Sequence, residues 1–154
     1  YRGFNLLLGD TKALFYASNR AEEPVAVEPG IHGLSNHLLD TDWPKVVAGR
    51  EQLQVLLQQN TLECEPLFEL MTNRTLTPGE MPRTEEASDL PEQLMRHNFI
   101  VSPKYGTRSS TILLSDRDSN VRCAERQYAP SGVATSTREH EFRVRHASAR
   151  ENKI

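Results

Sequence analysis

Two short apolar runs open the chain, at residues 4–8 and 13–17, with a Gly-Asp step at residues 9–10 between them. Apolar runs of this length on either side of a glycine-containing turn are typical of a β-hairpin. The alternation around Val25 predicts another short strand, and the apolar positions of residues 31–34 predict one more. The amino-terminal part of the chain is therefore expected to form a small antiparallel sheet.

Helical spacing replaces strand alternation in the middle of the chain. The apolar positions of residues 46–57 recur about every 3.6 residues, which predicts an amphipathic helix. Asp42 is placed to cap this helix, and Pro44 suits its first turn because an N–H is dispensable there. A second helix is predicted over residues 66–72. Residues 73–91 then combine prolines with acidic residues and predict a long loop or lid.

The last third of the chain again has the pattern of strands. Residues 107–115 and 121–128 flank a polar turn at 116–120, and residues 137–145 alternate as a half-buried or an edge strand does. Because helices and strands are segregated along the chain, the fold class is expected to be α+β with largely antiparallel sheets. Residues 1–154 are expected to be a single domain or the carboxy-terminal part of a larger one.

Composition narrows the function classes. The 154 residues carry a net charge of −3, which gives no basic footprint for nucleic acid, and no apolar run is long enough to span a membrane. Cys64 and Cys123 are far apart, so we expect free thiols and a cytoplasmic location. The five histidines form no metal-binding motif, and no metal site is predicted. Since the chain opens at Tyr1 and turns apolar almost at once, further sequence is expected upstream.

Four segments carry a resemblance to a known family. They are FNLLLGD, YASNR, GIHGLSNHLLDTDWPKV and YGTRSSTILLSDRDSNVRCAER, in that order. Together they resemble the carboxy-terminal half of the NRDE-motif family, also called the transport and Golgi organisation family. The likeness covers roughly residues 3–145 and is weakest across residues 73–91. Its most specific parts are the GLSN and LLDT stretches and the YGTRSST segment.

The resemblance implies a fold and leaves the nucleophile outside this chain. Family members are similar to N-terminal-nucleophile hydrolases, which implies that the chain forms part of an αββα sandwich with a helical pair. The family's nucleophilic cysteine follows the initiator Met, and an Asn-Arg-Asp-Glu motif comes shortly after it. This chain has neither element, since the SNR at residues 18–20 is followed by Ala21 and Glu22. No catalytic residue is therefore assigned, and the chain alone is expected to have no hydrolase activity.

Three functions remain open. The resemblance implies a fragment of a protein that binds and traffics a small amphipathic ligand, such as haem or an acyl-chain metabolite. The first alternative is a cysteine amidohydrolase that cleaves C–N bonds with a nucleophile upstream of this chain. The second is a structural interaction domain without a ligand. If haem is the cofactor, His32 and His37 are its candidate ligands.

Four residues are predicted to line one pocket: Gly33, Ser35, Asn36 and Arg108. Gly33 allows close backbone approach, and Ser35 belongs to the same rim. The Asn36 amide can donate to a developing oxyanion, or it can simply turn the backbone before the helix. Arg108, in a strand of small and apolar residues, either extends to the surface or points into a polar pocket that it shares with Asn36.

The first strand also suggests a binding surface. Leucines at positions 6, 7 and 8 place apolar side chains on both faces of the expected strand. If upstream sequence covers this strand in the parent protein, the strand is exposed in the present chain. Exposed apolar sheet surface drives association, so self-association is a further expectation.

Overall fold

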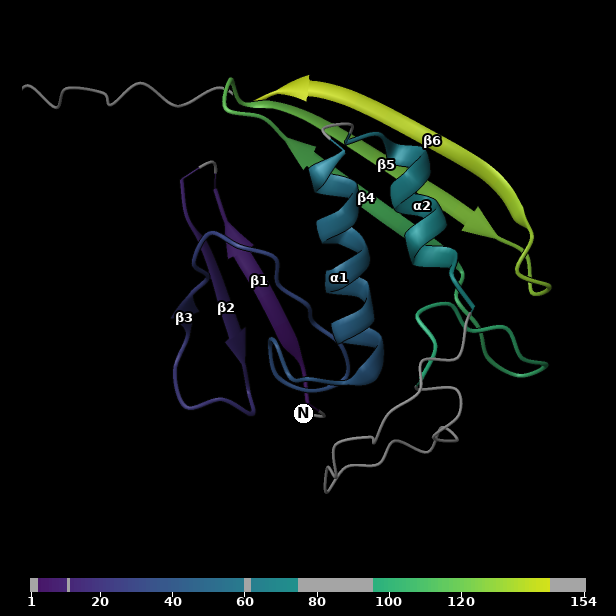
Figure 1. The fold of residues 1–154 in the computed structure, drawn as a ribbon, viewed down its shortest axis with the longest axis horizontal. Helices are drawn as coiled ribbons and strands as arrows, with labels where there is room; N and C mark the ends of the chain where they lie inside the picture. The colour runs from purple at the N-terminus through teal and green to yellow at the C-terminus, as the bar shows by residue number, and fades with distance from the viewer. Residues whose placement is uncertain (1–2, 11, 60–61, 75–95, 145–154) are drawn as a thin grey trace, which may run out of the picture.

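Six strands and two helices follow one another in the described part of the chain. The computed structural model describes residues 3–10, 12–59, 62–74 and 96–144. The elements are β1 (Asn5–Gly9), β2 (Leu14–Ser18), β3 (Val25–Ala26), α1 (Pro44–Gln58), α2 (Cys64–Thr72), β4 (Ser109–Ser115), β5 (Asn120–Tyr128) and β6 (Ala134–Arg143). The strands form two antiparallel sheets, in the orders β1-β2-β3 and β4-β5-β6 (Figure 1). The predicted α+β class with a helical pair is confirmed.

The predicted amino-terminal hairpin is confirmed, and an aspartate side chain closes its turn. The Asp10 carboxylate accepts hydrogen bonds from the main-chain N–H groups of Lys12 and Ala13, at 2.7 and 3.0 Å. Aspartate stabilises turns in this way because its short side chain reaches N–H groups two or three residues ahead. Tyr16 is the buried centre of this sheet, and its hydroxyl donates to Asn5 Oδ1 over 2.7 Å.

One strand of this first sheet is exposed along its whole length. Every residue of β1 is exposed, including Leu6, Leu7 and Leu8, and Leu8 keeps 67% of its surface accessible. The predicted exposure of this strand is therefore confirmed. Self-association through it stays a prediction.

Helix α2 packs against the second sheet and forms the main core. Cys64 and Phe68 lie one helical turn apart and meet Ile112 of β4 and Ala124 of β5. Figure 1 shows α2 lying over these two strands. Arg126 of β5 also links this sheet to α2. Its guanidinium lies 4.1 Å from the Phe68 ring centroid and bonds the Glu65 carboxylate through two nitrogens.

The start of α1 differs from the sequence prediction. The N-cap residue is Trp43, no side chain caps the helix, and the predicted Asp42 cap is wrong. Since Pro44 occupies the first helical position, Asp42 lies one residue outside the cap position. Trp43 is instead 1% exposed and anchors the helix start in the core.

Other elements also differ from the sequence prediction in their bounds or type. Residues 31–34 were predicted to form a strand, and they form a loop instead. The predicted loop over 73–91 lies almost entirely outside the described residues. β6 is an edge strand, the second of the two predicted alternatives; all its residues are exposed, and it begins earlier than predicted, at Ala134. In the described part of the chain, no helix has the length and apolar character needed to cross a membrane.

Candidate functional site

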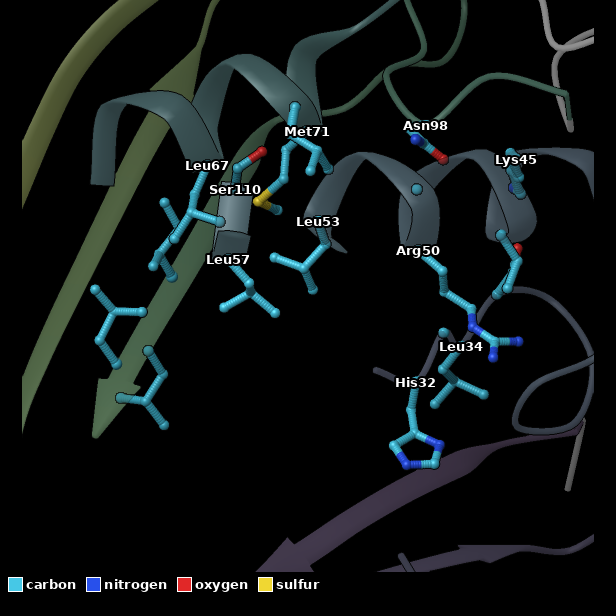
Figure 2. Close-up of a pocket in the computed structure, with 18 of the residues that line it drawn as sticks. His32, Leu34, Lys45, Arg50, Leu53, Leu57, Leu67, Met71, Asn98 and Ser110 are labelled. Carbon is cyan, nitrogen blue, oxygen red and sulfur yellow. The ribbon is translucent and has the colours of Figure 1, made fainter. Parts of the chain in front are cut away.

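A long groove of about 770 Å³ runs between α1, α2 and β4 (Figure 2). Its apolar lining consists of Leu34, Val46, Leu53, Leu57, Leu62, Leu67, Leu70, Met71, Ile112, Leu113 and Leu114. Its polar lining includes His32, Ser35, Lys45, Arg50, Asn98, Thr107, Ser109 and Ser110. A volume of this size is typical of small-molecule sites, which are mostly apolar with a few polar groups.

The two ends of the groove differ because the α1 residues that line it are cationic in the first half of the helix and apolar in the second half. Lys45 and Arg50 lie in its first half, and Leu53 and Leu57 lie in its second half. Arg50, Leu53 and Leu57 are three or four residues apart and therefore share a helix face, and Lys45 also lines the groove, from the first turn of the helix. Figure 2 shows Arg50 pointing toward His32 and Leu34, while Leu53 and Leu57 lie toward Leu67 and Met71 of α2. The groove is thus cationic at one end and apolar at the other.

Lys45 is held at the cationic end by Asn36. Its ammonium donates to Asn36 Oδ1 over 3.0 Å and lies 5.5 Å from the Trp43 ring centroid. The same Asn36 oxygen accepts a bond from the Ser35 hydroxyl at 3.0 Å. Burial lowers the pKa of Lys45, as expected for an ammonium beside apolar side chains. The Asn36 amide therefore acts here as an acceptor that orients a cation.

The loop of residues 33–40 carries this rim, and Asp40 closes it. The Asp40 N–H donates to the Gly33 carbonyl, and the Gly33 N–H donates to Asp40 Oδ1, both over 2.8 Å. His32 Nδ1 donates to Asp40 Oδ2 over 2.6 Å, and Arg50 Nη1 lies 3.9 Å from Asp40 Oδ1. These bonds replace the strand ladder predicted for residues 31–34. Partial burial alone would raise the pKa of Asp40. The hydrogen bonds from His32 and Gly33 outweigh burial, so the pKa of Asp40 is lowered.

The structure places two of the four predicted site residues in the groove and two outside its lining. Gly33 and Ser35 line the groove. Asn36 is exposed and outside the lining, and it contacts the rim through hydrogen bonds with Lys45 and Ser35. Arg108 is exposed outside the lining, although its neighbours Thr107 and Ser109 are part of it. The pocket shared by Asn36 and Arg108 stays a prediction.

Sequence reasoning missed Lys45 and Arg50 as site residues. Charged positions on an amphipathic helix are normally assigned to its solvated face. Spacing offered a signal for Arg50, which lies four residues after Val46 of the predicted apolar face, and it offered none for Lys45, which directly precedes Val46. Asp40 was missed as well, because its bond to a glycine seven positions earlier depends on loop geometry that residue spacing does not reveal.

Gly33 gives a first testable prediction. A Cβ built at this position would lie 2.5 Å from Val46 Cγ1, closer than real contacts allow. We expect Gly33→Ala to lower the free energy of unfolding by about 1–3 kcal/mol, as overpacking typically does. Urea denaturation followed by circular dichroism measures the change.

The control for this prediction is Gly49→Ala on the facing helix. Within the described part of the chain, its Cβ would meet only Asn98 Nδ2, at 4.0 Å, so alanine should be neutral or stabilising there by up to about 1 kcal/mol. Adding Val46→Ala to Gly33→Ala should make the double variant less destabilised than the sum of the two single changes. Equal losses for the alanines at 33 and 49 would contradict the close approach of loop and helix.

Both ring nitrogens of one candidate haem ligand, and one ring nitrogen of the other, are in hydrogen bonds. His32 Nδ1 bonds Asp40, and His32 Nε2 bonds the Glu28 carbonyl oxygen over 2.8 Å. His37 Nδ1 is 3.0 Å from the Thr41 hydroxyl. Axial ligation needs an unprotonated ring nitrogen directed at the iron, so His32 does not fit that role in this arrangement. In the described ranges, no group of three or more His, Cys, Asp or Glu side chains is arranged to hold a metal ion.

Fold and site together define a class: a small α+β protein with a mostly apolar groove that carries two cationic side chains at one end. The chain belongs to the Transport and Golgi organisation 2 family, whose family model matches residues 1–130. The predicted family membership is therefore confirmed.

Proteins from cattle and human extend the comparison. The chain is 33% identical over 159 residues to a Transport and Golgi organization protein 2 homolog of Bos taurus, with 94% of this chain and 58% of the relative covered. It is 29% identical over 157 residues to the homolog of Homo sapiens, with 92% of this chain and 57% of the relative covered. The chain thus spans a little over half the length of these relatives.

Proposed function

We propose that this chain binds a small amphipathic molecule with an anionic head and an acyl-type tail. In this proposal the parent protein moves such molecules and contributes to the transport and Golgi organisation named in its relatives. The observation that carries the proposal is the α1 groove, with Lys45 and Arg50 at one end and a leucine-rich lining at the other. An anion pairs with the first part, and an apolar chain is removed from water along the second.

Haem is the less favoured member of the same ligand class. The two cations could pair with its carboxylates, but the ring nitrogens of His32 are already in hydrogen bonds. A straight acyl chain needs no ligand from the protein beyond apolar contact. The proposal therefore commits to an acyl-chain anion, with haem as an outcome that the binding experiment can detect.

The proposal is tested by titrating the chain with straight-chain carboxylates of increasing length and with the matched alcohols. Each CH₂ buried in the groove is worth at most about 0.8 kcal/mol, so affinity should rise by up to about fourfold per carbon until the groove is filled. The carboxylate should bind more tightly than its alcohol because only the carboxylate pairs with Lys45 and Arg50. Affinity that does not depend on chain length would contradict the proposal, and tight binding of haem that fatty carboxylates do not displace would favour haem.

The exposed first strand supports a second candidate, an interaction domain. Leu6, Leu8 and Phe15 are all exposed on paired strands β1 and β2. Contiguous apolar surface of this kind favours association with another protein surface. Sedimentation equilibrium at increasing concentration tests it: the chain should associate, and a Leu6→Ser, Leu8→Ser variant should not. A chain that stays monomeric at high concentration would contradict this candidate.

The amidohydrolase alternative rests on a nucleophile outside this chain. Both cysteines are free thiols, and burial raises the pKa of Cys64, which disfavours the reactive thiolate. Free thiols also support the proposed cytoplasmic location. We expect the purified chain to hydrolyse no amide. Turnover that disappears in a Cys64→Ser or Cys123→Ser variant would contradict this expectation.

A further inference from the structure

The hydrogen bonds of His32 determine its protonation. Nδ1 lies 2.6 Å from an Asp40 carboxylate oxygen, and Nε2 lies 2.8 Å from the Glu28 carbonyl oxygen. A carboxylate and a carbonyl oxygen can only accept, so each ring nitrogen has to carry a hydrogen to make both bonds. A neutral imidazole has a single N–H. The observed geometry is therefore that of the imidazolium.

The charged groups that face this imidazolium link it to the groove. They are the Asp40 carboxylate from the 33–40 loop and the Arg50 guanidinium from α1. Glu28 faces it through its main-chain carbonyl. The bond to Asp40, followed by the bond to Glu28, raises the pKa of His32 against the opposing effects of burial and Arg50. Arg50 lines the groove and lies 3.9 Å from the same carboxylate, beyond the distance of a good hydrogen bond.

We infer that protonation of His32 controls how strongly the α1 groove binds an anionic head. With the imidazolium present, Asp40 is neutralised and Arg50 is available to the ligand. A neutral ring has lost its positive charge and can make only one of the two bonds, so Asp40 is no longer neutralised and competes for the Arg50 guanidinium, its remaining cationic partner. His32 thus acts through Asp40 and Arg50 as a positioning residue, and this regulation rests on the proposed function of the groove.

The direction of the pH dependence follows from charge. At the cationic end, His32, Lys45 and Arg50 carry three positive charges against one negative charge on Asp40 when the ring is protonated, and two against one when it is neutral. Anion affinity should therefore fall as the pH rises through the raised pKa of His32. By linkage, a bound anion should raise that pKa further. Closure of the 33–40 loop follows the same direction, because the bond to Asp40 is complete below the pKa and weakened above it.

The test uses dodecanoate and its matched alcohol, dodecanol, titrated calorimetrically against the chain at several pH values around neutrality. For the wild-type chain, dodecanoate affinity should fall about fivefold or more from the acidic to the alkaline side of the His32 transition, a typical coupling between two sites. Dodecanol affinity should stay constant. The His32→Gln variant should bind dodecanoate with a flat pH profile, at the weaker wild-type level.

A second histidine of the loop provides the matched control. Among the residues that the structure describes, the His37 ring bonds the Thr41 hydroxyl and no carboxylate, so His37→Gln should keep the wild-type pH profile. In the ligand-free chain, NMR should show the His32 ring and the Gly33 amide titrating together, above the usual histidine range, and shifting upward with dodecanoate.

The outcomes separate the two proposals. Dodecanoate binding that is tight but independent of pH, or equally dependent on pH in His32→Gln, overturns the control by His32 and leaves the proposed function standing. Absence of dodecanoate binding at every pH overturns the proposed function and this inference with it. A His32 pKa at or below the usual value in the ligand-free chain overturns the inference without reference to any ligand.

Discussion

Replacing Phe68 by alanine is expected to lower the free energy of unfolding by about 3–5 kcal/mol, the usual cost of deleting a buried aromatic ring. Phe68 is 1% exposed and forms the centre of the cluster that joins α2 to β4 and β5. Its ring also supports the Arg126 guanidinium 4.1 Å away. The substitution therefore removes both the core contacts of the ring and the stacking partner of Arg126, which links β5 to α2. Urea denaturation of both chains, followed by circular dichroism, measures the difference.

A second phenylalanine of the same sheet serves as the control. Phe142 of β6 is 52% exposed, so Phe142→Ala should change stability by no more than about 0.5 kcal/mol. If Phe68→Ala unfolds the chain completely, Phe68→Leu gives a measurable smaller loss, because leucine fills part of the space. Similar losses at positions 68 and 142 would mean that α2 does not hold the core.

Reversing both cations of the groove is expected to abolish most of its preference for anions. A hydrogen bond to a charged group contributes about 1.5–3 kcal/mol, so the Lys45→Glu, Arg50→Glu variant should bind a fatty carboxylate roughly tenfold to a hundredfold more weakly. Affinity for the matched alcohol should change little, because the leucine-rich end is untouched. Titration of both ligands against both chains measures the difference.

The control variant carries the same change of net charge elsewhere. Lys12 and Arg117 are exposed in two turns, and neither lines the groove, so Lys12→Glu, Arg117→Glu should keep the wild-type affinity. Near-ultraviolet circular dichroism checks that both double variants are folded, and Lys45→Gln, Arg50→Gln replaces the reversal if it is not. Equal weakening by the two reversals would assign the effect to overall charge and contradict the cationic end of the groove.

Elements with a clear local pattern were predictable from the sequence, because apolar runs around a turn, apolar alternation and helical spacing each indicate one kind of element. The hairpin of β1 and β2, helix α1 and edge strand β6 are examples. Asp42 was misplaced as a cap because its residue type suits several adjacent positions, and only the backbone at Trp43 decides between them. Residues 31–34 looked like a strand because apolar composition does not show that Asp40 takes the hydrogen bonds of Gly33.

The site was less predictable than the fold, because it is assembled from distant segments. Gly33 and Ser35 were recognised from their place in a distinctive loop, and both line the groove. The groove also needs Leu67 from α2 and Ile112 from β4, and nothing local connects these residues to Lys45. Asn36 was predicted for its capacity to donate, whereas its oxygen accepts from Lys45. Residue type gives the available chemistry, and packing decides which part of it is used.

The backbone of Asp40 restricts which residues evolution can place there. Its φ is +57°, a region that glycine, asparagine and aspartate enter more readily than other residues do. Glycine would keep the turn and lose every side-chain bond, and asparagine would keep one acceptor oxygen where His32 and Gly33 now use two. Backbone conformation thus limits this position to a few residue types, and among them aspartate makes both side-chain bonds. A sequence that changes this aspartate must change His32 with it or accept a loop that no longer closes on the groove.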